Sequence, residues 1–279
     1  MRALLLDVGG TFIKGAVLKG TVPFPVLEGE FQVKTDSFSD RDAIKASLSE
    51  AFAKGGDVLQ VAVAIPGPFD FTRGVFLMKH KFASVYGESF RGLAGIPDDI
   101  PVSFIHDVNC MLEGELAYGA AKGEENVALV TLGTGLGFTV ATEGKVLKAP
   151  SLSPAVGIWN LPYEGGILED YVSARGIASL YGKDMAVKDI ATNARNVDGK
   201  AAEAFSKAGA ILAGAIAPIL REYSVERLLF GGQISRSFDL FEKALQPLLE
   251  DCPSLRNIGP VSDISRATFL GLAASLAEV

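Results

Sequence analysis

The sequence predicts an α/β fold made of two similar halves, each opening with a glycine-rich hairpin. In residues 4–20, LLLDVGGTFIKGAVLKG, an apolar strand, a glycine turn and a second strand follow one another. Residues 129–145, LVTLGTGLGFTVATEGK, repeat this order. A duplication of this kind predicts two lobes with a cleft between them, where ligands usually bind. The residues that match are Gly9 with Gly133, Gly10 with Thr134 and Val17 with Ala141.

Strand and helix signals alternate around the two hairpins. Apolar residues at Ile44, Leu48 and Phe52, with Ser39 and Asp40 as candidate caps, predict the first helix. We place the lobe boundary near residue 112: the N-terminal lobe is 1–112, the C-terminal lobe is 113–264, and the closing segment 265–279 returns to the first lobe. The expected helices are 38–56, 107–123, 200–223 and 265–277, and the expected strands are 58–66, 101–105 and 227–230.

Composition narrows the class of protein. Of the 279 residues, 48% are hydrophobic and 21% are charged, as in globular proteins. The net charge of −7 gives no basic footprint, so we expect no nucleic-acid partner. No apolar run approaches the roughly 20 residues of a membrane span, and the N-terminal apolar stretch is too short for a signal peptide. Two cysteines, Cys110 and Cys252, exclude a disulfide framework and suit a reducing compartment, so we expect a cytoplasmic protein.

The motif DVGGT in the first hairpin is typical of phosphate binding. Without a Cβ at Gly9 and Gly10, backbone N–H groups can converge on an anion. Asp7, at the end of the strand, can hold a hydrated Mg²⁺, while Thr11 and Lys14 can meet phosphate oxygens. The alternative is a tight hairpin in which the aspartate only satisfies turn amides, since glycine turns are common.

Two further glycine motifs point to a nucleotide. The second hairpin supplies Gly133, Thr134 and Gly135. Its pattern superficially matches a dinucleotide fingerprint, but an alternating strand follows instead of a helix, so a triphosphate suits it better. In LLFGGQISRS, Gly231 and Gly232 follow a buried strand and can let a nucleoside lie on the backbone. An ordinary strand-to-helix turn is the alternative there.

Asp107 is the candidate general base. The strand 101–105 ends just before His106 and Asp107, and in open α/β sheets the carboxyl ends of strands face the ligand. A carboxylate there can accept a proton from a hydroxyl that attacks a phosphoryl group. Asp107 can also cap the helix that follows, which is worth about 1 kcal/mol, and the two roles are compatible.

Taken together and in their order along the chain, these motifs resemble those of the ROK family of sugar kinases. The resemblance covers nearly the whole sequence. The resemblance implies a two-lobed, duplicated, actin-like ATPase (ribonuclease H-like) fold with a central cleft. It also implies ATP-dependent, glucokinase-like phosphorylation of a hexose or hexose derivative, with Asp107 as base, Mg²⁺ bridging the phosphates and a homodimer. In IPGPFDFTRG, Pro66 and Gly67 match the loop beside the sugar, and Glu169 in GGILEDYVS matches a sugar contact. LLFGGQIS matches the adenosine loop.

The chain also departs from the pattern of the family. In SPAVGIWN, Ala155 and Ile158 stand where a sugar-binding Glu and His are expected, and no cysteine lies nearby, so we expect no zinc site. His106 replaces an Asn before the catalytic aspartate; it can still bind a hydroxyl, but it titrates near neutral pH. Alternatively, Glu169 is an acidic residue on the surface of a helix and contacts no sugar. Trp159 can line the sugar pocket or belong to the core, as can Tyr163.

Two functions remain open on these grounds. The first is an ATP-dependent sugar kinase. The second is a catalytically weak sugar-binding regulator or sensor of the same fold, suggested by Ala155 and Ile158. Loss of two sugar contacts makes glucose a poor default substrate. A repressor of the family would need a helix-turn-helix ahead of the first hairpin. Only three residues precede Leu4, so we expect none.

Overall fold

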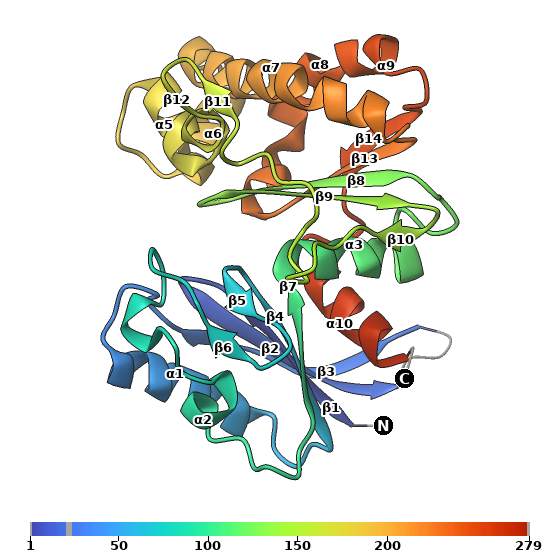
Figure 1. The fold of residues 1–279 in the computed structure, drawn as a ribbon. Coiled ribbons are helices and arrows are strands. Elements are labelled where there is room, and N and C mark those ends of the chain that lie inside the picture. Colours follow the sequence, from blue (N-terminus) through green and yellow to red (C-terminus); the bar gives the residue numbers. More distant parts are fainter. Residues whose placement is uncertain (1, 21–23, 278–279) are drawn as a thin grey trace. The chain divides into compact units, whose positions relative to one another are not determined.

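The computed structural model describes residues 2–20 and 24–277; residues 1, 21–23, 278 and 279 lie outside the described part. The described chain forms two compact units. Unit 1 contains the described residues of 1–118, 148–153 and 268–279, and unit 2 contains 119–147 and 154–267. Figure 1 shows that each unit is a sheet covered by helices.

The sheet of unit 1 has the strand order β3-β2-β1-β4-β7. Strands β1, β2 and β3 are antiparallel neighbours, whereas β1, β4 and β7 run parallel. The strands are β1 (Ala3–Val8), β2 (Phe12–Gly20), β3 (Val26–Lys34), β4 (Gln60–Ile65) and β7 (Val102–His106). The short elements that follow β4 are β5 (Phe69–Asp70), β6 (Val75–Phe76) and the 3₁₀ helix η1 (Ala83–Val85).

Helices cover both faces of this sheet, which explains the apolar run LLL in β1. Leu4 and Leu6 pack into the core with α1 (Arg41–Lys54) and α2 (Phe90–Ala94). Ala3 and Leu5 point the other way and pack with α10 (Ala267–Ala277) and with Cys110 of α3 (Asp107–Tyr118). Since successive strand residues face opposite sides, a strand buried on both faces reads as continuously apolar.

The sheet of unit 2 repeats the pattern with the order β10-β9-β8-β13-β14. Its antiparallel and parallel pairs fall at the same positions as in unit 1. The backbone duplication therefore extends beyond the two hairpins. The strands are β8 (Val127–Leu132), β9 (Leu136–Thr142), β10 (Lys145–Val146), β13 (Arg227–Gly231) and β14 (Asn257–Pro260).

The helices of unit 2 pack on its sheet (Figure 1). They are α4 (Glu169–Val172), α5 (Ala174–Tyr181), α6 (Val187–Arg195), α7 (Gly199–Glu222), the 3₁₀ helix η2 (Gln233–Leu240), α8 (Glu242–Leu245) and α9 (Pro247–Asp251), with the small hairpin β11 (Pro162–Tyr163) and β12 (Gly166–Ile167). By length and apolar composition, α7 alone among the described helices is long and apolar enough to cross a membrane, a property that buried core helices share. Its residues Phe205, Leu212 and Ile216 lie in the core of unit 2, which is typical of a buried helix.

Several elements differ from the sequence prediction. The helix expected over 107–123 ends at Tyr118, and it is continuous across residue 112, where the lobe boundary was expected. The segment 148–153 belongs to unit 1 because it is bound to α3. Lys148 Nζ lies 2.6 Å from Glu113 Oε1, and Asn109 Nδ2 donates to Leu152 O at 3.3 Å. After Gly232 the chain forms a 3₁₀ helix rather than an α-helix.

Candidate functional site

Three predicted groups lie at one edge of the sheet of unit 1. The register pairs Asp7 of β1 with Ala64 of β4, and Ile65 of β4 with His106 of β7. Pro66 and Gly67 follow β4 directly, and Asp107 follows β7. Because the carboxyl ends of parallel strands meet at the same edge, residues from the first hairpin, the proline-glycine loop and the candidate base are brought together.

Asp107 is held at this edge by contacts through one carboxylate oxygen. Oδ1 accepts a hydrogen bond from the Val108 N–H at 2.8 Å and lies 3.0 Å from His106 Nδ1. The buried Nδ1 of His106 is not aligned for a hydrogen bond in the described structure, so this contact is mainly electrostatic. Oδ1 thus contacts only the neighbouring Val108 amide of α3, not the N–H groups one or two residues further on that a helix cap binds, and the side chain remains 36% exposed.

The surroundings of Asp107 favour its ionised form. Burial opposes ionisation, but His106, the Val108 amide and the positive charge of Lys81 together hold the pKa of Asp107 below its usual value. An acceptor for a hydroxyl proton must be ionised at working pH. Asp107 therefore has the charge state that a general base needs at neutral pH.

Asp7 has the opposite electrostatic character. Burial raises the pKa of Asp7 to about 6, Lys14 opposes this shift, and the negative charge of Asp107 adds to it. Lys14 lies directly opposite Asp7 on the antiparallel strand β2. The negative charges of Asp7 and Asp107 lie close enough to repel one another, and carboxylate oxygens are the donors that a hydrated Mg²⁺ prefers. A cation beside Asp7 would offset this repulsion, which makes Asp7 a candidate for the water-mediated Mg²⁺ contact that the sequence predicts.

The first glycine turn is tight and leaves room for backbone only. Gly9 N donates to Phe12 O at 3.0 Å, and Ser37 N donates to Gly10 O at 2.8 Å. A Cβ built on Gly10 would lie 3.0 Å from Ser37 Oγ, a distance that real Cβ atoms seldom reach. Thr11 is exposed beside this turn. The arrangement suits an anion that approaches the backbone closely.

Gly67 lies beside His106 in the same unit. A Cβ on Gly67 would be 3.4 Å from His106 Cδ2 and 3.7 Å from Ser153 Oγ. Pro66 and Gly67 are half-buried. Ser153, which no sequence motif indicated, therefore joins the predicted sugar-side residues through the segment that is bound to α3.

In unit 2, the second glycine turn is hydrogen-bonded to the first residues of α4 and α5. Glu169 Oε2 accepts a hydrogen bond from Leu136 N at 2.8 Å, and Ala174 N donates to Gly133 O at 2.9 Å. A Cβ on Gly135 would lie 2.9 Å from Glu169 Oε2, so this carboxylate approaches the turn as closely as glycine permits. Thr134 remains exposed at the tip.

Glu169 is also paired with an arginine that sequence reasoning missed. Arg175 Nη2 donates to Glu169 Oε1 at 2.9 Å, and Arg175 Nε donates to Asp170 Oδ1 at 2.9 Å. Both oxygens of Glu169 are thus engaged within unit 2. Arg175 stands five residues after Asp170, the end of the ILED segment, and nothing in its local sequence distinguishes it from a surface cation.

The third glycine loop adjoins the second glycine turn. Gly231 pairs with Thr131 across the parallel strands β13 and β8. Gly232 has φ 82°, and a Cβ there would lie 2.3 Å from Leu132 O, so only glycine fits. The two predicted nucleotide-binding segments of unit 2 are therefore neighbours.

The residues that depart from the family pattern have different fates. Ile158 is 0% exposed and packs in the core of unit 2, so it cannot contact a ligand. Ala155 is exposed, and Trp159 is 50% exposed. Tyr163 packs edge-on against Tyr171, with ring centroids 4.7 Å apart. In residues 2–20 and 24–277, no three His, Cys, Asp or Glu side chains are grouped to hold a metal by themselves.

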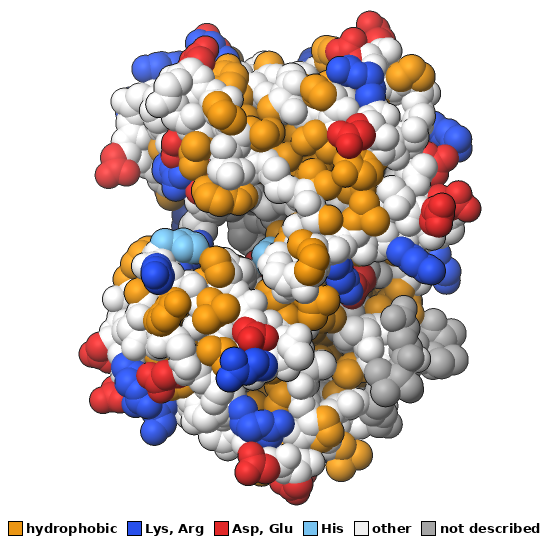
Figure 2. Space-filling model, viewed as in Figure 1, with side chains coloured by type: hydrophobic (Ala, Val, Ile, Leu, Met, Phe, Trp, Pro, Cys, Tyr) orange, Lys and Arg blue, Asp and Glu red, His pale blue; other side chains and the backbone are white. Residues whose placement is uncertain are grey.

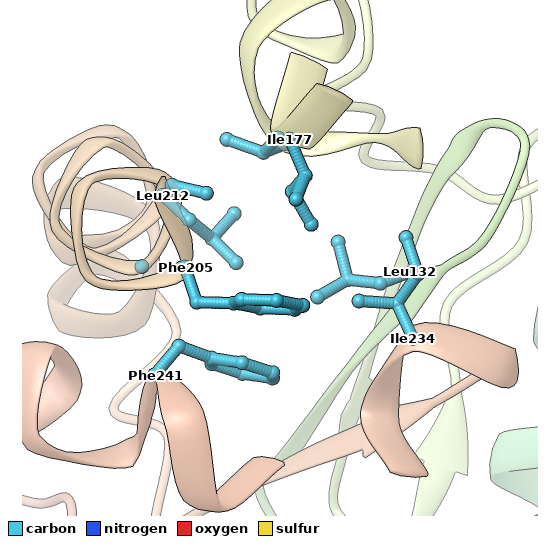
Figure 3. A pocket seen from close by; sticks show the side chains of 9 residues that line it. Leu132, Ile177, Phe205, Leu212, Ile234 and Phe241 are labelled. Atoms are coloured by element: carbon cyan, nitrogen blue, oxygen red, sulfur yellow. The ribbon is translucent and has the colours of Figure 1, made fainter. Parts of the chain in front are cut away.

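A cavity inside unit 2 does not compete as a ligand site. Figure 3 shows apolar side chains from α7, η2 and the end of β8 pointing into it. Its volume is about 10 Å³, close to the minimum for a single water. It is a packing defect of the core.

On the face drawn in Figure 2, Lys and Arg side chains are interspersed with Asp and Glu wherever side chains are described.

A two-lobed, duplicated α/β fold with glycine turns at the sheet edges defines the class of actin-like ATPase folds. The model of the ROK family matches residues 4–274, and this chain belongs to that family. A glucokinase from Halalkalibacterium halodurans is 25% identical over 283 residues, covering 88% of this chain and 84% of that relative.

Solved structures agree with this fold. A ROK family glucokinase from Streptomyces griseus, in complex with glucose and AMPPNP, superposes with a TM-score of 0.79 at 22% identity, covering 99% of each chain. A ROK family transcriptional regulator, a homologue of the E. coli MLC protein, also superposes with a TM-score of 0.79, at 19% identity. That match covers 98% of this chain and 77% of the regulator. The fold is therefore shared by an enzyme and a regulator.

Proposed function

We propose that this protein is an ATP-dependent kinase that transfers a phosphoryl group to a hydroxyl of a hexose or hexose derivative. The observation that carries the proposal is the place and charge state of Asp107. It follows β7 at the sheet edge, its pKa is held below the usual value, and it lies near Asp7 and the first glycine turn. Membership of the ROK family and the similarity to glucokinases support the same reaction.

In this proposal Asp107 accepts the proton of the sugar hydroxyl as that oxygen attacks the terminal phosphorus of ATP. The new O–P bond forms as the bond to the β-phosphate oxygen breaks, and ADP leaves. His106, Pro66 and Gly67 line the sugar side in unit 1. His106 favours the ionised form of Asp107, and its other ring nitrogen lies beside Gly67.

We propose that each unit contributes a glycine turn to nucleotide binding. Gly9, Gly10, Thr11 and Lys14 belong to unit 1, and the turn of Gly133, Thr134 and Gly135, with Gly231 and Gly232, belongs to unit 2. Asp7 would hold Mg²⁺ through water, and the metal would supply charge neutralisation on the phosphates. Glu169 remains a candidate sugar contact, although its two engaged oxygens support a role in holding the second glycine turn.

The second candidate is a sugar-binding regulator with weak catalysis. The buried Ile158 and the exposed Ala155 supply no polar sugar contact at the positions where the family has Glu and His. A solved regulator of the same fold shows that this architecture also serves regulation. A cytoplasmic location and a homodimer remain predictions under both candidates.

The two candidates are separated by a substrate screen with purified protein. Mg·ATP and a panel of hexoses, hexosamines, N-acetylated hexosamines and glycosides are supplied, and ADP release is measured for each sugar. A kinase gives sugar-dependent ADP release. Binding of a sugar, measured by calorimetry, without ADP release from any member of the panel would support the regulator and contradict the kinase.

The assignment of the base is tested by Asp107→Asn. We expect kcat to fall about 10²-fold or more, because the acceptor of the hydroxyl proton is lost. The affinity for ATP should remain within a few-fold of wild type, because the glycine turns are untouched. Asp57→Asn, at an exposed position of the same unit outside the predicted site, is the matched control. Turnover that is unchanged in Asp107→Asn would exclude this mechanism.

A further inference from the structure

Lys81 lies beside the first glycine turn, although it is far from that turn in the sequence. A Cβ built on Gly10 would be 3.9 Å from Lys81 Cδ. The side chain is half-buried, and its positive charge helps to lower the pKa of Asp107. Lys81 thus places a cation near both the candidate phosphate turn and the candidate base, all within unit 1.

Hydrogen bonds tie the backbone at Lys81 to this turn. Phe82 N donates to Ser37 O at 2.7 Å, and Ser37 N donates to Gly10 O at 2.8 Å. Ser84 Oγ donates to Ser39 O at 2.8 Å. Ser37 therefore links the segment that carries Lys81 directly to the glycine turn, so the two are held in register.

The residue after Lys81 adopts a strained conformation. Phe82 has φ 52°, a left-handed conformation that is uncommon for a bulky residue. Its ring is fully buried and packs against Phe76 with centroids 5.5 Å apart. Strain of this kind persists where surrounding contacts impose it, and it clusters at functional sites. Here it fixes the direction in which the chain leaves Lys81.

Lys81 has no ion-pair partner within 4.0 Å among the described residues, unlike Lys148, which pairs with Glu113. Its effect on Asp107 therefore acts over more than 4.0 Å, and the ammonium group can still bind an anionic ligand. The glycine turn beside it has the sequence pattern of a phosphate-binding turn. Lys81 and the first glycine turn are therefore both suited to the same ligand, an anionic group such as a phosphate.

We propose that Lys81 binds the terminal phosphate of the nucleotide and stabilises the phosphoryl group during transfer. This inference rests on the proposed kinase function and adds a residue to it. As the sugar oxygen bonds to the terminal phosphorus and the bond to ADP breaks, the proton passes to Asp107. Lys81 stays protonated throughout and offsets negative charge on the transferred group.

The test compares Lys81→Met with Lys79→Met. Lys79 lies two residues earlier and is exposed, with its Nζ 5.4 Å from the Tyr86 ring centroid. Lys79→Met therefore removes the same charge from the same segment and serves as the control. Affinities for Mg·ATP and Mg·ADP are measured by calorimetry, and kcat and the sugar KM by ADP release. Lys81→Arg, which retains the charge, tests rescue. Lys81→Gln replaces Lys81→Met if the latter does not fold.

We expect Lys81→Met to weaken ATP binding about tenfold or more while ADP binding changes less than about twofold, since only ATP carries the terminal phosphate. The value of kcat should fall about 10²-fold, the sugar KM should stay near wild type, and Lys79→Met should change little. Equal losses for ATP and ADP, or an unchanged kcat with unchanged ATP affinity, would overturn the role of Lys81.

The outcomes for Lys81 and for the kinase are distinguishable. If wild-type protein binds ATP but phosphorylates no sugar, the kinase fails, and the ratio of ATP to ADP affinity still decides the role of Lys81. If wild-type protein binds no ATP in the presence of Mg²⁺, both proposals are overturned.

Discussion

Asp107 Oδ1 lies 3.0 Å from His106 Nδ1 at the point where β7 passes into α3. Adjacent residues at the end of a strand are thus coupled electrostatically. Burial tends to raise the pKa of Asp107, and His106 is the first of the opposing influences that bring it below the usual value. The histidine therefore controls the pH range in which Asp107 is ionised.

Replacing His106 should shift the acidic side of the pH–activity profile to higher pH. In His106→Ala, burial of Asp107 persists while the stabilising positive charge is lost, so the pKa of Asp107 should rise. Activity that needs ionised Asp107 should then be lost at a higher pH as the solution is acidified. The measurement is the pH profile of kcat/KM for the best sugar of the screen. An acid limb that stays in place, or moves to lower pH, would contradict this coupling.

Asp7→Asn should stabilise the protein while abolishing activity. The pKa of Asp7 in the folded state, about 6, exceeds its ordinary value of 3.8. Between these values the folded state retains a proton that the unfolded state has released, so stability falls as pH rises through that range. Above pH 6 the substitution should add about 1–3 kcal/mol to the free energy of unfolding. Metal-dependent turnover should be lost, because the predicted Mg²⁺ contact is removed.

Urea unfolding at pH 4 and pH 7.5, without metal or nucleotide, measures this gain. Asp57→Asn, at an exposed position of unit 1, is the matched control. A loss of stability in Asp7→Asn at pH 7.5 would show that the carboxylate is not strained by its surroundings.

Glu169→Gln should affect the nucleotide more than the sugar. Glu169 holds the second glycine turn through Leu136 N and is itself held by Arg175. Loss of the charge weakens both contacts, so we expect the KM for ATP to rise about tenfold. The sugar KM should change by less than about twofold. Arg175→Met should act in the same direction, and Glu203→Gln on the exposed side of α7 should be silent.

Steady-state kinetics with each substrate varied in turn give both constants for Glu169→Gln. A rise confined to the sugar KM would instead support the sugar contact that the sequence predicted for Glu169.

Gly67→Ala should weaken sugar binding without unfolding the protein. The added methyl would stand 3.4 Å from His106 Cδ2 and 3.5 Å from His106 Nε2, which is ordinary van der Waals contact. It would fill the space beside His106, so we expect the sugar KM to rise about tenfold. Gly20→Ala, where nothing lies within 4 Å, is the control. An unchanged sugar KM would remove Gly67 from the sugar side of the site.

Much of the fold was predictable because its signals are local. The hairpin at residues 4–20, its repeat at 129–145 and the helix capped by Asp40 are encoded by glycine spacing and apolar periodicity in contiguous residues. The strand that ends at Asp107 was readable for the same reason. The lobe boundary was misplaced at residue 112 because the helix signal across it is continuous, and only packing reveals that 148–153 joins unit 1.

The sequence by itself determined the duplicated α/β pattern, the glycine turns and the place of Asp107 at a strand end, because backbone conformation at these points depends on neighbouring residues. Tertiary structure alone decided that Lys81 lies at Gly10, that Glu169 is engaged by Arg175 and Leu136, and that Ile158 is buried in the core. These relationships join segments far apart in the chain. Their free energy comes from contacts that form only when the sheets and helices pack, so no local pattern records them.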